Sequence, residues 1–123
     1  MIVLKKKISR QDSSCPVIHT QQFIGGKWRI AILWSLKHES KRFGQIKKEL
    51  GTVSEKMLNQ ELKHLQNMGA IKRKSFNEMP PRVEYSLKDK GQSLISVIEH
   101  LISWGQIDMD NQKIKKSKSS LWI

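Results

Sequence analysis

Apolar residues recur at helical spacing along most of the chain and change to a strand-like alternation in one stretch. Pro16 suits the first turn of a helix, where a missing N–H has no helical partner, and Gly25 and Gly26 end that helix. A second helix is predicted from Lys27 to about Lys37. It is apolar on nearly every side, which is typical of a buried central helix.

Two further helices are predicted around a tight turn. A short amphipathic helix covers Phe43–Leu50, and Gly51 breaks it. The next helix runs to about Met68, and Gly69 is its C-terminal cap. The segment from Thr52 to Glu55 matches a capping box, in which the threonine hydroxyl and the glutamate carboxylate satisfy free N–H groups. A short helix, a turn and a longer helix with a polar outer face predict a helix-turn-helix.

A hairpin and a long helix complete the predicted domain. Strands are expected at Ala70–Phe76 and Arg82–Leu87, joined by a linker with two prolines, and a final helix at about Asp89–Ile107. The fold class is therefore mainly α with a small β-hairpin wing: a winged helix-turn-helix. Residues 1–14 are expected to be a flexible basic arm, 15–110 the folded domain, and 111–123 a basic, disordered tail.

Charge adds a functional indication. The 123 residues carry 23 Lys and Arg against 11 Asp and Glu, a formal charge of +12. Such a protein favours polyanions, either nucleic acid or an anionic membrane face, although lysine-rich composition alone is an alternative explanation. Residues 37–82 are strongly basic, whereas 83–112 are slightly acidic and rich in Leu and Ile. This division indicates one part that binds a polyanion and another that self-associates.

Several classes of protein are disfavoured. No apolar stretch reaches the roughly 20 residues of a membrane helix, and the charges near Met1 follow the apolar residues, the reverse of a signal peptide. We therefore expect a cytoplasmic protein and no membrane partner. One cysteine excludes an intrachain disulfide framework. No catalytic, cofactor-binding or metal site is expected, because no phosphate loop or nucleophile motif is present and the histidines lack ligand spacing: His19, His38, His64 and His100.

Short motifs in a fixed order then identify a family. The chain resembles the HxlR-type regulators, winged-helix relatives of the MarR superfamily, over about residues 15–105. The resemblance implies a dimeric bacterial transcription factor, and it implies sensing of oxidants or electrophiles in several members at the position of Cys15. The matching pieces are Cys15-Pro16, Gly25-Gly26-Lys27-Trp28, Lys41-Arg42-Phe43, Ser54-Glu55-Lys56-Met57-Leu58, Pro80-Pro81-Arg82-Val83-Glu84-Tyr85-Ser86-Leu87 and Trp104-Gly105.

The candidate DNA contacts are polar and basic residues of the helix-turn-helix and wing. Asn and Gln can pair with adenine, while Lys suits guanine or phosphate. Ser54 has a pure capping role as its alternative, and Arg82 has ion pairing with Glu84 or Glu78 as its alternative to minor-groove contact. The candidates are Ser54, Lys56, Asn59, Gln60 and Lys63 in the recognition helix, Gln45 and Lys47 in the helix before it, and Lys72, Arg73, Lys74 and Arg82 in the hairpin.

The last helix has an apolar stripe too wide for one small core. We interpret it as core plus a homodimer interface, the alternative being that it only closes its own domain. A two-fold dimer would bind a roughly palindromic operator. The interface candidates are Leu94, Ile98, Leu101, Ile102 and Trp104.

Cys15 is the candidate redox sensor. It precedes a helix start, where the helix dipole favours a thiolate, but an unpaired cysteine is more often a small buried apolar residue. Without a second cysteine in the chain, only a Cys15–Cys15 link between subunits, a mixed disulfide or alkylation is available.

The leading hypothesis is a sequence-specific transcriptional regulator, a repressor or an activator, acting on double-stranded DNA as a homodimer and open to an electrophile or small-molecule inducer. A sequence-indifferent architectural DNA binder and a winged-helix protein-docking module are the alternatives. Asn59 and Gln60 argue against the architectural binder, because a binder of phosphates alone needs only cations.

Overall fold

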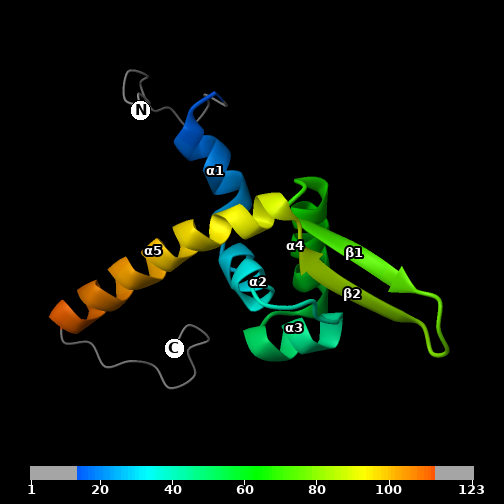
Figure 1. The fold of residues 1–123 in the computed structure, drawn as a ribbon. Helices are drawn as coiled ribbons and strands as arrows, with labels where there is room; N and C mark the ends of the chain where they lie inside the picture. The colour runs from blue at the N-terminus through cyan, green and yellow to red at the C-terminus, as the bar shows by residue number, and fades with distance from the viewer. Residues whose placement is uncertain (1–13, 113–123) are drawn as a thin grey trace.

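The computed structural model describes residues 14–112, so most of the predicted arm and most of the predicted tail lie outside the described residues. Figure 1 shows a small helical body from which a hairpin projects on one side and the end of the last helix on the other. The predicted winged helix-turn-helix is confirmed. Its elements are α1 (Pro16–Ile24), α2 (Arg29–Ser35), α3 (Phe43–Leu50), α4 (Glu55–Asn67), β1 (Ile71–Phe76), β2 (Arg82–Leu87) and α5 (Asp89–Asn111).

The helix ends differ from prediction in three places. Helix α2 starts at Arg29 and ends at Ser35, shorter than predicted at both ends. The predicted capping box is wrong: Thr52 belongs to the turn, where its N–H donates to Leu50 O at 3.1 Å, and Ser54 caps α4 instead. Helix α5 continues to Asn111, so the predicted start of the disordered tail is a helical residue.

The core forms where α2 meets the inner faces of the other helices and the base of the hairpin. Ala31, Ile32 and Leu33 of α2 are at most 1% exposed, which confirms the predicted central helix. The remaining buried apolar residues of this cluster are Phe23, Leu36, Ile46, Leu50, Val53, Leu58, Leu62, Leu65, Ala70, Ile71, Tyr85, Ile95 and Ile98.

The hairpin is antiparallel, with pairs running from Ile71 opposite Leu87 to Phe76 opposite Arg82. The other edge of β2 is also occupied. Lys41 forms a bridge with Tyr85, in which the Lys41 N–H donates to Tyr85 O at 2.9 Å and the Tyr85 N–H donates to Lys41 O at 2.8 Å. The segment before α3 is therefore joined directly to the wing. The Met79-Pro80 peptide bond near the tip is cis.

Helix α5 begins in close contact with the chain that leaves α4. A Cβ atom placed on Gly91 would lie 2.2 Å from the carbonyl oxygen of Ala70 and 3.1 Å from Leu87 Cδ2. Only glycine allows this approach. From there α5 crosses the body, and its C-terminal half extends beyond it (Figure 1). Within residues 14–112, no helix combines the length and the apolar character needed to cross a membrane.

Candidate DNA interface

Helix α4 separates its apolar and polar residues onto opposite faces. Leu58, Leu62 and Leu65 are at most 1% exposed and fix the helix to the core. At 3.6 residues per turn, Lys56, Gln60, Lys63 and Asn67 lie opposite this stripe and Asn59 lies on its flank. All five of these polar side chains are exposed, and no ion pair to them exists among the described residues. The predicted contacts of α4 are thus brought together on one free polar surface.

Both ends of α4 are fixed by hydrogen bonds from backbone N–H groups. The Ser54 hydroxyl oxygen accepts from Met57 N at 3.0 Å, so the capping role weighed for Ser54 is present. At the other end, Gly69 has a φ of 80°, and Ala70 N and Gly69 N donate to Leu65 O and Gln66 O. This is a Schellman motif, and it confirms Gly69 as the cap. The exposed face of α4 is therefore presented by a helix of defined length.

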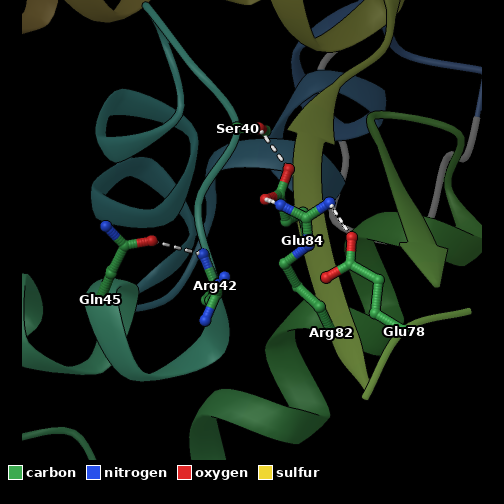
Figure 2. Close-up of polar contacts among 6 residues, drawn as sticks. All are labelled: Ser40, Arg42, Gln45, Glu78, Arg82 and Glu84. Atoms are coloured by element: carbon green, nitrogen blue, oxygen red, sulfur yellow. Dashed lines mark hydrogen bonds and ion pairs between the residues drawn. The ribbon is translucent and has the colours of Figure 1, made fainter. Parts of the chain in front are cut away.

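Helix α3 places Gln45 at the surface and Lys47 in a half-buried position. The Gln45 Oε1 accepts from Arg42 N at 2.9 Å, which leaves the Gln45 amide NH₂ as its free donor group (Figure 2). Arg42, exposed at the start of α3, was not among the predicted contacts. Its position in the motif Lys41-Arg42-Phe43 could have indicated it.

Glu49 of α3 binds the segment that leads from α2 to α3. Its carboxylate accepts hydrogen bonds from Lys41 Nζ and from Ser35 Oγ, the latter at 2.6 Å. Burial raises the pKa of Glu49, but hydrogen bonds from Lys41 and Ser35 and the charges of Lys41 and Lys37 outweigh it. The pKa is held below its ordinary value of 4.5. Lys41 is consequently an internal partner of Glu49 as well as the bridge to β2.

The hairpin carries its free cations on β1. Lys72, Arg73 and Lys74 are exposed. Lys72 and Lys74 share one face of the hairpin, because side chains alternate along a strand, and Arg73 lies on the other. The pairing register places Lys74 opposite Glu84 and Phe76 opposite Arg82 on that same face. The three predicted cations of β1 are thus divided between two surfaces.

Arg82 is not a free cation. Its Nη2 lies 2.8 Å from Glu78 Oε2, and its Nη1 lies 3.2 Å from Glu84 Oε2. Figure 2 shows the guanidinium between the two carboxylates, with Ser40 on the far side of Glu84. The ion pairing that was the alternative to DNA contact is the state seen in this structure.

The model of the HxlR-like helix-turn-helix family matches residues 23–113. The chain belongs to the HxlR-like helix-turn-helix family. An uncharacterised HTH-type transcriptional regulator of Halalkalibacterium halodurans is 39% identical over 97 residues, which is 78% of this chain and 86% of that one. HxlR-family membership makes this chain a helix-turn-helix transcriptional regulator, and its relatives are regulators rather than enzymes.

Solved structures support the same assignment for this HxlR-family chain. A MarR-family transcriptional regulator from Porphyromonas gingivalis W83 superposes with a TM-score of 0.74 at 39% identity, covering 82% of this chain and 97% of the other. The redox regulator HypR in its oxidised form has a TM-score of 0.72 at 32% identity, covering 75% and 95%. The winged-helix fold and the family are thus shown by sequence and by structure.

Cys15 of this HxlR-family chain is buried, with 2% of its surface exposed. It occupies the N-cap position of α1, as predicted, and its carbonyl oxygen accepts from His19 N at 2.9 Å. The thiol is therefore shielded from solvent in this conformation, as in the alternative of a buried apolar role.

The predicted interface residues fall into two groups. Ile98 is fully buried in the core of its own protomer, so its assignment to a dimer interface is wrong; Leu94 and Ile102 also pack partly against that core. Leu101 and Trp104 are 46% and 71% exposed. The apolar stripe of α5 is in fact two stripes, one turned inward and one outward. The outward residues are Val97, Leu101, Trp104 and Ile107, of which Val97 and Ile107 were not among the interface candidates.

A hydrogen-bonded junction that the sequence did not indicate joins α1 to α4. His64 Nε2 lies 2.8 Å from Gln22 O, and Arg29 Nη1 donates to the same carbonyl at 3.2 Å. Arg29 Nε also pairs with Glu61 Oε1 at 2.6 Å. Glu61 and His64 are close on one flank of α4, so α1, whose N-cap is Cys15, is tied to the candidate recognition helix.

Proposed function

We propose that this regulator binds DNA as a homodimer, with α4 in the major groove and the hairpin beside it. The observation that carries the proposal is the outer face of α4. Lys56, Gln60 and Lys63 are exposed on a helix whose other face is fixed in the core. A major groove admits one α-helix, whose outward amides and cations can then meet base edges and phosphates. Specific readout by Asn59 and Gln60 favours a regulator over a sequence-indifferent binder.

The contacts outside α4 would hold the DNA backbone. Gln45 and Lys47 of α3, together with Lys72, Arg73 and Lys74 of β1, supply donors and cations for phosphates. Ser54 would add its hydroxyl, alongside the backbone N–H groups at the start of α4, where a helix favours an anion. The sequence predicted that Arg82 contacts the DNA from the wing, but in the structure its guanidinium is paired with Glu78 and Glu84.

The outward stripe of α5 is the proposed dimer surface. Leu101, Trp104 and Ile107 are exposed on the part of α5 that extends beyond the body. Beside them lies a groove of about 320 Å³, lined by Trp34, Glu99, Ile102, Ser103, Gln106 and Ile107. Exposed apolar patches of this kind mark association sites. Two-fold pairing would place the two α4 helices about 34–36 Å apart and imply a roughly palindromic operator.

A titration with DNA tests the proposal. The DNA upstream of the protein's own gene and a scrambled fragment are compared at several salt concentrations. We expect a preference of roughly a thousandfold or more for the native fragment. The variant Lys56→Ala/Lys63→Ala should bind both fragments more weakly and reduce the salt slope by about 2, whereas the exposed Lys88→Ala should change neither. Equal affinity for both fragments would support an architectural binder, and no affinity at low salt a docking module.

Sensing through Cys15 is proposed as the regulation of this binding. The similarity to HypR, a redox regulator, favours it, and the Gln22–His64–Arg29 junction offers a physical link from α1 to α4. Because Cys15 is buried, its modification requires α1 to move, and that movement would be transmitted to α4. We expect diamide to lower the operator affinity of the wild type. A Cys15→Ser variant that responds to diamide as the wild type does would refute the proposal.

A further inference from the structure

The surroundings of Arg82 leave little of the guanidinium for DNA. Both Nη atoms are directed at carboxylates, Glu78 at 2.8 Å and Glu84 at 3.2 Å. The Cζ atom of the group lies 3.8 Å from the ring centre of Phe76. Its Nε is buried and has no acceptor within residues 14–112. A phosphate is bound best by the planar fork of an arginine, and here that fork is already used.

The contacts of Glu84 continue from the hairpin to the helix-turn-helix. Ser40 Oγ donates to Glu84 Oε1 at 2.8 Å, while Arg82 pairs with the other carboxylate oxygen. Ser40 lies in the segment between α2 and α3, next to the Lys41 that bridges to Tyr85. A continuous series therefore runs from Glu78 near the tip through Arg82 and Glu84 to Ser40 (Figure 2).

The charge of this series is opposite to what phosphate binding needs. One guanidinium and two carboxylates give this series one net negative charge, within a hairpin that is proposed to lie beside DNA. By electrostatics alone, both glutamates should weaken binding. Glu84 and Arg82 are also mostly shielded, with side chains 22% and 26% exposed, whereas Glu78 is 51% exposed. Their arrangement is better explained if these residues hold the hairpin in place than if they contact DNA.

We propose that Arg82 is a positioning residue: Glu78, Arg82, Glu84 and Ser40 form a brace that holds the wing at a fixed angle to α3 and α4. The phosphate contacts of this face of the hairpin then come from Lys72 and Lys74, which are exposed on it. A wing that is already ordered loses less conformational entropy when DNA binds, so bracing raises affinity without a contact. This inference rests on the proposed DNA binding.

The test uses variants for which bracing and direct contact predict opposite signs. Glu84→Gln removes a negative charge, so the hydrogen bonds from Arg82 and Ser40 no longer have a charged acceptor. Bracing predicts that its DNA affinity falls by about tenfold, and direct contact predicts a rise. Ser40→Ala changes no charge and should lower affinity severalfold. The matched control is Glu55→Gln, the same loss of charge at the start of α4, where the exposed Glu55 has no side-chain partner among the described residues; its affinity should rise.

Arg82 itself is tested by the salt dependence. Bracing predicts that Arg82→Lys binds more weakly than wild type at every salt concentration, with the same salt slope, because no phosphate contact is lost. Direct contact predicts that Arg82→Gln lowers the slope by about 0.9. A rise in affinity of Glu84→Gln, or that loss of slope in Arg82→Gln, would overturn the proposal. Equal urea midpoints for all variants exclude global unfolding as the cause.

A measurement without DNA separates this inference from the proposed function. Amide hydrogen exchange of β1 and β2 should accelerate at least tenfold in Glu84→Gln and Ser40→Ala, but not in Glu55→Gln. If wild-type protein binds no DNA while exchange accelerates, the brace stands as a structural device and the proposed function fails. If exchange in the hairpin is unchanged, the brace is refuted even in a protein that binds DNA tightly.

Discussion

Helix α4 and the hairpin are both rich in charged residues, yet they use them differently. The outward cations of α4, Lys56 and Lys63, have no ionic partner among residues 14–112. In the hairpin, Arg82 is held by two glutamates and covers Phe76. Helix α4 is held in place by the buried leucines of its inner face. The hairpin is held by ion pairs between its own side chains. A basic residue near a candidate interface is therefore a DNA contact only if no carboxylate of the protein already binds it.

The largest expected effect removes the apolar support of α4. Leu62→Ala should lower the free energy of unfolding by about 2–5 kcal/mol, because Leu62 is 1% exposed in the core. Met57→Ala on the exposed surface of the same helix is the control and should cost well under that amount. Urea unfolding followed by circular dichroism measures both. Equal losses would mean that α4 is not held by its inner stripe.

The next effect separates recognition of bases from binding of phosphates. Gln60→Ala should weaken binding to the operator by about 1–3 kcal/mol and leave binding to scrambled DNA nearly unchanged, as expected of a base contact. Lys74→Ala should weaken both equally and lower the salt slope by about 1. Paired titrations on the two fragments give both quantities. A uniform loss for Gln60→Ala would remove the distinction between α4 and the hairpin.

A smaller effect concerns Ser54, which has a capping role and a proposed phosphate contact. Ser54→Ala should destabilise the protein by about 1 kcal/mol, since the bond to Met57 N is lost. Ser54→Asp keeps a cap and should restore most of the stability, but its charge should oppose DNA. Thermal unfolding and titration of both variants distinguish the roles. If Ser54→Asp binds DNA like the wild type, Ser54 is a cap alone.

The smallest effect is the pH dependence that comes from Glu49. Its pKa is lowered in the folded protein, so its contribution is present above the pKa of the unfolded chain and is lost as the pH falls through the folded value. Glu49→Gln should be slightly less stable than wild type near pH 7, and the difference should narrow below about pH 4.5. Because the Glu49 side chain is 37% exposed, solvent screens the effect. Urea midpoints of the two proteins across this pH range would show a constant difference if Lys41 and Ser35 did not stabilise the carboxylate.

Periodicity predicted most of the fold because burial follows it directly. The leucine stripe of α4, the glycine cap at Gly69 and the two strands of the hairpin all depend on residues close in sequence. The errors arose where distant segments decide the outcome. Thr52 matched a local capping pattern, but the tight turn with buried Val53 placed the cap two residues later, at Ser54.

The candidate site was predictable only in part, for the same reason. The outer face of α4 follows from helical spacing alone. The Ser40–Glu84 bond joins residues 44 positions apart, and the Gln22–His64 bond joins residues 42 apart, so neither has a local signature. Ile98 could not be separated from Leu101 by type or by the general apolar character of α5. That separation requires knowing where α2 lies.

Gly91 lies where the proposed dimerisation helix of a subunit meets the DNA-binding part of the same subunit. It is the point where the helix that would carry the partner subunit meets the chain leaving the recognition helix, with a would-be Cβ 2.2 Å from Ala70 O. Because α5 is one continuous helix, a small change in its direction at Gly91 becomes a larger displacement at Trp104 and Ile107. A single methyl group at this position would change the direction of α5 in each subunit. The pair would then no longer match the pitch of the double helix, although every residue that touches DNA were unchanged.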